Sequence, residues 1–282
     1  MKKLKSILCI AFIVCSFILV ACKSKDPDVP PQTPESTTIT LSEAKSTIVN
    51  ALAIDNMGVQ SSFSSVINRN VFTKLNTVEI FMEGKFDYGT TISGTAEKNV
   101  FGNWTKYSLQ SGENYGYYDG DNAYLKNNSD YGTTTFEYSY FGLILQSMDC
   151  VYIDLLFIDD AFNSIYGNTV EKISTKDNYT LTMDIDMSKY VDYVMAQCEI
   201  RDLPAEGLFG EGDYLQRNKD EGSVELVINF DNNHRILGLD MAINSLYSEG
   251  GATSLQETRI NITKSSQDIT QPQWVADYLA NQ

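Results

Sequence analysis

The sequence predicts an α+β protein whose largest part is an antiparallel β-sheet. From Thr77 onward, apolar and polar residues alternate with a period of two, which is typical of half-buried strands. Asp119-Gly120 separates two β-rich runs and is a strong hairpin signal. The segment Tyr140–Phe162 instead repeats its apolar residues at helical spacing. We therefore expect many short strands, with helices before and between them.

The first helix is expected to begin near residue 40. Thr40 and Ser42 are residue types that cap helices, and Glu43 favours a first helical turn. The apolar residues that follow at helical spacing are Ala44, Ile48, Ala51 and Leu52. A second, weakly periodic segment extends from Phe63 to about Lys74.

An antiparallel meander is expected after these helical segments. The predicted strands are Thr77–Glu83, Thr91–Phe101, Trp104–Leu109, Tyr115–Tyr118 and Ala123–Lys126. They are short and are separated by turns such as Tyr88-Gly89 and Gly102-Asn103, so each is expected to pair with the next.

Tyr140–Phe162 predicts a helix that is apolar on most of its sides. Its main apolar stripe is Ile144, Met148, Val151, Leu155, Ile158 and Phe162. Leu145, Tyr152 and Leu156 are also apolar but lie off that stripe. A helix of this kind is buried or faces something apolar. If the main stripe packs on the core, we expect Leu145, Tyr152 and Leu156 to line a cavity or contact a ligand.

The remaining chain predicts one more helix and a second group of strands. The helix begins at a Ser188 cap and ends at Cys198, and an acidic loop with glycines runs from there to Gly222. The predicted strands are Tyr179–Asp186, Val224–Phe230, Arg235–Ile243 and Leu255–Thr263. Cys198 shares a helical stripe with valines and is expected to be buried. A disulfide between Cys198 and Cys150 is the alternative.

The first 22 residues have the features of an export leader. Three lysines precede an uncharged apolar run, Ser6–Val20, which is shorter than the roughly 20 residues that a membrane span needs. A basic start, a short apolar core and small residues before a cleavage site are typical of a signal peptide. Leu19-Val20-Ala21-Cys22 resembles the lipobox of bacterial lipoproteins, which implies cleavage after residue 21 and acyl chains on Cys22. The alternative is an ordinary signal peptide with a coincidental cysteine.

Composition divides the rest of the chain into two parts. Residues 22–40 hold four of the six prolines and are expected to form a lipidated cysteine and a Pro-rich tether. Residues 41–282 are expected to form a single β-rich domain. The formal net charge of −16 disfavours nucleic-acid phosphates and anionic headgroups as partners. Acyl chains on Cys22 are therefore expected to provide the membrane attachment.

Nothing in the chain indicates catalysis, so we expect no enzyme, catalytic residue, metal or cofactor. The single histidine, His234, lies in a predicted turn, and no nucleophile-elbow, zinc-protease or phosphate-loop motif is present. Carboxylate pairs such as Asp159/Asp160, Asp184/Asp186 and Glu211/Asp213 are expected by chance among 37 acidic residues. Asp119–Asn122 lacks the later glycine and glutamate of a calcium loop, so it is interpreted as a hairpin turn.

The order of leader, tether, helix, meander, internal helix and further strands resembles the LolA/LppX-like group of exported lipoproteins. The residues that carry the resemblance are Leu19–Cys22, the hairpins Tyr117–Lys126 and Phe230–Leu237, and the C-terminal stretch Asn261–Pro272. The resemblance implies a curved antiparallel sheet, an incomplete β-barrel, with helices packed across its concave face. It also implies a cavity that holds acyl chains.

Two functional hypotheses follow. The first is an exported, membrane-anchored, non-enzymatic lipoprotein that binds or carries a lipid or other hydrophobic ligand. The alternative is a cell-surface lipoprotein with a filled core that interacts with proteins or glycans, because the 17 tyrosines would suit an aromatic surface. Both place the protein at the cell membrane or outer membrane, lipid-anchored and facing outside the cytoplasm.

Overall fold

The computed structural model describes residues 34–53, 77–86, 89–98, 103–128, 130–148, 164–200, 209–249 and 252–282. These residues belong to one compact unit, Pro34–Gln282. Within them, twelve strands form one antiparallel sheet, and five α-helices and a short 3₁₀-helix accompany it. The two outermost strands do not pair with each other, so the sheet is not closed. The α+β class and the unclosed antiparallel sheet are therefore confirmed.

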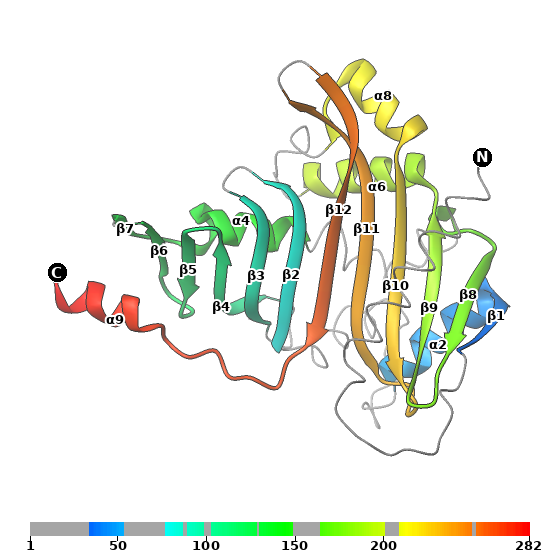
Figure 1. Cartoon of the computed structure of the whole chain (residues 1–282), viewed down its shortest axis with the longest axis horizontal. Helices are drawn as coiled ribbons and strands as arrows, with labels where there is room; N and C mark the ends of the chain where they lie inside the picture. Colours follow the sequence, from blue (N-terminus) through cyan, green and yellow to red (C-terminus); the bar gives the residue numbers. More distant parts are fainter. Residues whose placement is uncertain are drawn as a thin grey trace, which may run out of the picture. The chain divides into compact units, whose positions relative to one another are not determined.

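Two meanders make up most of the sheet (Figure 1). The first consists of β2 (Thr77–Phe86), β3 (Gly89–Lys98), β4 (Trp104–Ser111), β5 (Asn114–Tyr118), β6 (Ala123–Asn127) and β7 (Asp130–Thr134). The second consists of β8 (Thr169–Ser174), β9 (Asn178–Ile185), β10 (Ser223–Asp231), β11 (Ile236–Glu249) and β12 (Ala252–Lys264). Pairing of β12 with β2 joins the two meanders. The N-terminal strand β1 (Glu35–Thr40) pairs with β8, so β1 and β7 are the edges.

Strand β1 shifts the expected start of the domain. It occupies the end of the range 22–40 that was expected to be a tether, so ordered structure begins before residue 41. Nearly all of its residues are polar, so its sequence shows no alternation of apolar and polar positions, and β1 is almost entirely exposed. Pairing with β8, distant in sequence, therefore determines this strand.

The helices are α2 (Leu41–Ala53), α4 (Tyr140–Met148), α6 (Met187–Ile200), α8 (Gly212–Glu221) and α9 (Gln273–Ala280), with the 3₁₀-helix η1 (Phe136–Tyr138). The start of α2 is a capping box, in which Thr40 is the cap, as one of the two predicted cap residues, and Glu43 lies in the first turn, as predicted. The Glu43 carboxylate accepts the Thr40 N–H at 2.8 Å, and the Thr40 hydroxyl accepts the Glu43 N–H at 3.2 Å. The hydrogen bonds from Thr40 lower the pKa of Glu43. The predicted segment Phe63–Lys74 lies outside the described residues.

One face of the sheet carries the main hydrophobic core. Alternation places every second residue of a strand on this face, and in β10 these are Val224, Leu226, Ile228 and Phe230, all buried. Helices α2, α4 and α6 contribute to the same cluster through Ile48, Leu145 and Val191, among others. We refer to this side as the inner face and to the opposite side as the outer face.

A smaller cluster lies on the outer face of the first meander. It joins Tyr117 of β5 and Tyr124 of β6 to Ile269 and to Val275 of α9. Trp274 and Tyr278 of α9 pack against it. The sequence predicted only a short tail here, and the tertiary contact of α9 with the tyrosines explains the helix.

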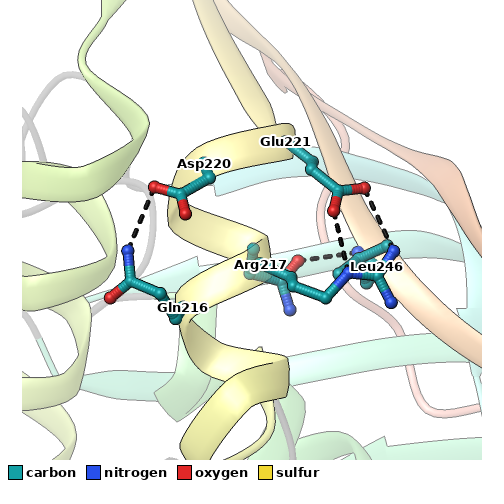
Figure 2. Close-up of polar contacts among 6 residues, drawn as sticks. Gln216, Arg217, Asp220, Glu221 and Leu246 are labelled. Atoms are coloured by element: carbon teal, nitrogen blue, oxygen red, sulfur yellow. Dashed lines mark hydrogen bonds and ion pairs between the residues drawn. The ribbon is translucent and has the colours of Figure 1, made fainter.

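Helix α8 corrects another sequence expectation, because it lies in the range that was interpreted as an acidic loop. The Asn218 side chain is completely buried. Its amide donates to the Phe209 carbonyl at 2.9 Å, and its oxygen accepts the Leu246 N–H at 2.7 Å. On the exposed side, Arg217 pairs with Glu221 and Gln216 donates to Asp220 (Figure 2). Tertiary contacts of one asparagine thus hold a helix that shows no apolar period.

Candidate ligand-binding site

Helix α4 is positioned by contacts to the first meander. The Ser139 hydroxyl accepts the Gly142 N–H at 3.0 Å and so caps the helix. The same hydroxyl lies 2.9 Å from the Tyr107 hydroxyl of β4. Phe141 packs on Gly116 of β5, where a Cβ atom would lie 2.2 Å from its ring. The start of α4 is therefore fixed on the inner face.

Leu145 lies within the buried side of α4. Phe141, Leu145 and Met148 are at most 1 % exposed and follow the i, i+4, i+7 spacing of one helix face. Ile144 is only half-buried. The expectation that Leu145 stands off the packed stripe is therefore wrong, because the stripe is rotated toward Phe141. Tyr152 and Leu156, and the rest of the predicted helix to Phe162, lie outside the described residues.

Two buried polar atoms in this region of the chain have no hydrogen-bond partner. They are the Ser111 hydroxyl oxygen, at the end of β4, and the Gln146 side-chain nitrogen, next to Leu145 in α4. Ser111 belongs to the alternating inner-face residues of β4 and is 0 % exposed. A buried polar group without a partner costs about 1–3 kcal/mol. A hydrogen bond to a bound molecule would remove this cost at either atom.

Two buried tyrosines of the inner core, Tyr107 and Tyr166, do not behave as acid–base groups near neutral pH. Burial raises the pKa of Tyr107 to about 12, and the hydrogen bond with Ser139 offsets only part of this increase. Burial also raises the pKa of Tyr166. Both phenols remain protonated over the physiological range, so they serve as apolar bodies with hydrogen-bonding tips.

The tyrosine-rich segment divides between the two faces instead of forming one groove. Tyr107 and Tyr118 belong to the inner face, where their rings lie 5.7 Å apart. The outer-face tyrosines are Tyr115, Tyr117, Tyr124 and Tyr131. Tyr138 of η1 is 81 % exposed. The division arises because successive side chains of β5 and β6 point to opposite faces of the sheet.

The other candidate positions have structural explanations. His234 is exposed in a turn, as predicted, with φ +61° and its Nδ1 2.9 Å from the Tyr179 hydroxyl. The Asp119 carboxylate accepts the N–H groups of Asp121 and Asn122 at 2.9 and 2.8 Å, which supports the hairpin interpretation. Cys198 is buried, as predicted, while Cys150 and Cys22 lie outside the described residues.

Of the three carboxylate pairs named from the sequence, the structure describes Asp184/Asp186 and Glu211/Asp213. Asp186 accepts the Lys189 N–H at 3.1 Å at the start of α6, a capping role that the sequence assigned to Ser188. Asp184 lies opposite Glu225, whose pKa is raised by burial and by nearby carboxylates. Asp159 and Asp160 lie outside the described residues. Across the part of the chain that the structure describes, no three His, Cys, Asp or Glu side chains gather as metal ligands.

Sequence reasoning missed the residues that position α4. Ser139 precedes an apolar helical run, which is a recognisable cap signal. The sequence does not indicate that the side chains of Ser111 and Gln146 lack hydrogen-bond partners, because this depends on neighbours from other elements. Among the described residues, no helix has the length and apolar character needed to span a membrane.

No protein-family model matches the chain, and no curated protein matches it. The likeness to the LolA/LppX-like group therefore stays a prediction from the residues named above.

Proposed function

We propose that this protein is an exported lipoprotein, anchored to a cell membrane or outer membrane through Cys22, that binds or carries a lipid or other hydrophobic ligand. It catalyses no reaction and uses no cofactor. The ligand occupies the inner face near Leu145, and Tyr152 and Leu156 contribute to its binding. This assignment is the function implied by the LolA/LppX-like resemblance.

The observation that supports the proposal is that two buried polar atoms, Ser111 Oγ in β4 and Gln146 Nε2 in α4, have no hydrogen-bond partner. Both atoms belong to elements whose neighbouring residues, such as Leu109 and Leu145, are buried in the apolar core. A lipid supplies ester or hydroxyl oxygens that can bond to these two atoms, and alkyl chains that match the apolar inner face. Both requirements are met by one amphiphilic molecule.

Mass spectrometry of small molecules that co-purify with the full-length protein tests this proposal. We expect an amphiphile that is retained by the wild type and reduced several-fold in Gln146→Leu, because the variant cannot donate a hydrogen bond. Gln216→Leu, on the exposed side of α8, is the matched control and should retain the molecule. Absence of any bound amphiphile, or equal retention by the two variants, contradicts the proposal.

The membrane anchor is tested separately by Cys22→Ser. Because acyl chains contribute about 0.8 kcal/mol per buried methylene, their loss should release the protein from membranes. Fractionation of cells that express the variant measures this release. Equal membrane retention of wild type and variant, with normal cleavage of the leader, contradicts lipidation of Cys22.

A further inference from the structure

A continuous row of accessible side chains crosses the outer face of the sheet. Each residue lies directly opposite the next on the neighbouring strand, from β11 through β12 and β2 to the edge strand β7. The members of this outer row are Asp240, Asn261, Phe81, Ser93, Gln110, Tyr115, Lys126 and Tyr131. None of them is buried, and Phe81 and Tyr131 are each 44 % exposed.

Aromatic and hydrogen-bonding side chains share this row. Phe81, Tyr115 and Tyr131 present rings. The residues between them present a hydroxyl, an amide and an ammonium group, from Ser93, Gln110 and Lys126. Single exposed apolar residues are common on protein surfaces. A register that aligns rings and polar groups across consecutive strands is a more specific arrangement, because it offers both kinds of contact along one line.

Several side chains of the row are held in place. The Asp240 carboxylate accepts hydrogen bonds from Asn261, within the row, and from Asn229 of β10 at 2.6 Å. The Lys126 ammonium lies 5.4 Å from the centre of the Tyr115 ring and 5.8 Å from that of Tyr131. Groups that are already ordered lose little conformational entropy on binding.

The spacing of the row matches an extended sugar chain. Neighbouring strands lie about 4.8 Å apart, which is close to the advance per ring of an extended β-linked hexose polymer. A chain that runs across the strands therefore places about one ring on each strand. Sugar rings offer C–H faces to aromatic side chains and hydroxyls to amides and carboxylates, so both kinds of residue in the row find a partner.

The C-terminal segment runs along the adjacent row of the same face. Ser265 donates to Glu79 of β2 at 3.3 Å, and Ile269 packs on Tyr117 and Tyr124. Figure 1 follows this segment from the end of β12 to α9. At the far end, Tyr278 of α9 stacks on Tyr131 with ring centres 5.7 Å apart. An extended chain thus already crosses these strands beside the row and borders it on one side.

Charge favours an uncharged ligand. The row itself contains one acid, Asp240, and one base, Lys126. On the side away from the C-terminal segment, Glu83 lies opposite Arg259, and Glu225 lies opposite Asp184. With a net charge of −16 on the whole chain, a polyanionic polymer is repelled.

We propose that the outer row binds a neutral, extended, β-linked polysaccharide that lies across the strands. This site is on the opposite face of the sheet from the proposed hydrophobic ligand, so either can fail without the other. Binding would hold the membrane-anchored protein on a polysaccharide of the cell surface or its surroundings.

Isothermal titration calorimetry with the full-length protein tests the proposal, in a polyoxyethylene detergent because sugar detergents would compete. The probes are hexasaccharides of β-1,4-linked glucose, xylose, mannose and N-acetylglucosamine, with hexagalacturonate as the anionic comparison. We expect binding of at least one neutral probe and tighter binding as its chain is lengthened from two rings to six.

Variants locate the binding. Phe81→Ala and Tyr115→Ala should each weaken it about tenfold, as loss of one well-placed ring contact does. Tyr138→Ala, which removes a more exposed ring outside the row, should leave it unchanged. No binding of any neutral probe, preference for hexagalacturonate, or equal binding by the row variants and Tyr138→Ala would overturn the proposal. Circular dichroism confirms that each variant is folded.

Discussion

The two faces of the sheet use the same strands in opposite ways. On the inner face, residues such as Phe230, Leu181 and Tyr107 are 0 % exposed and join helices in one apolar cluster. On the outer face, the alternating neighbours are mostly threonine, asparagine and carboxylate residues. Among the described residues, the apolar cluster of this face is the small one beneath α9. Period-two alternation produces both faces at once.

This difference separates stability from recognition. Burial of inner-face residues supplies the hydrophobic free energy that holds the sheet together. Side chains of the outer row contribute little to that burial, so they are free to be selected for contacts with another molecule. The predictions below test this difference between the faces and the packing of the inner one.

The largest effect is expected for Phe230→Ala on the inner face. Phe230 is completely buried and stacks on Tyr179 at 4.8 Å between ring centres. Truncation leaves a cavity and should lower the free energy of unfolding by about 3–5 kcal/mol in urea denaturation. The outer-face control, Phe81→Ala, should change it by no more than about 0.5 kcal/mol. Similar losses for both variants would show that the faces are not energetically distinct.

Alkaline pH should weaken the inner face through Tyr107. Its pKa is raised to about 12 by burial, whereas an unfolded tyrosine titrates near about 10. The unfolded chain therefore loses this proton first, so the stabilisation is complete below about pH 10 and disappears as pH approaches 12. The full contribution is about 2–3 kcal/mol.

The measurement is the free energy of unfolding between pH 9 and 12. Tyr107→Phe, which has no phenolic proton, should show a shallower decline than the wild type. An identical slope for the two proteins would mean that Tyr107 ionises equally easily in the folded and unfolded states.

A matched pair of glycines gives the smallest effect. In Gly116→Ala, the new methyl group meets the Phe141 ring at 2.2 Å, which should cost about 1–3 kcal/mol by displacing α4. In Gly132→Ala, on the edge strand, nothing lies within 4 Å of the new atom. That variant should be neutral or more stable by up to about 1 kcal/mol. Thermal unfolding of both variants checks this contrast, and equal costs would place α4 elsewhere.

Local patterns predicted the elements whose determinants are close in sequence. The Thr40–Glu43 capping box, the Asp119-Gly120 hairpin and the Asp231–His234 turn each depend on residues within a few positions of one another. The alternating strand β10 was predicted for the same reason. These predictions needed no knowledge of the neighbouring strands.

Elements held by distant residues were missed or displaced. Helix α8 depends on Asn218 reaching Phe209 and Leu246, and α9 depends on tyrosines of β5 and β6. Both therefore looked like irregular chain. The buried stripe of α4 was misplaced because Phe141, packed on Gly116, sets the rotation of the helix.

The sequence by itself determined the apolar side of the predicted strands and the turns between neighbouring strands, whereas the export leader ending before Cys22 stays a prediction. Only the tertiary structure decided that β12 pairs with β2, that β1 pairs with β8, and which residues become cross-strand partners. Periodicity assigns a residue to a face of its own strand, but register between distant strands depends on how all the inner-face side chains pack together. For this reason the outer row is visible only in the folded protein.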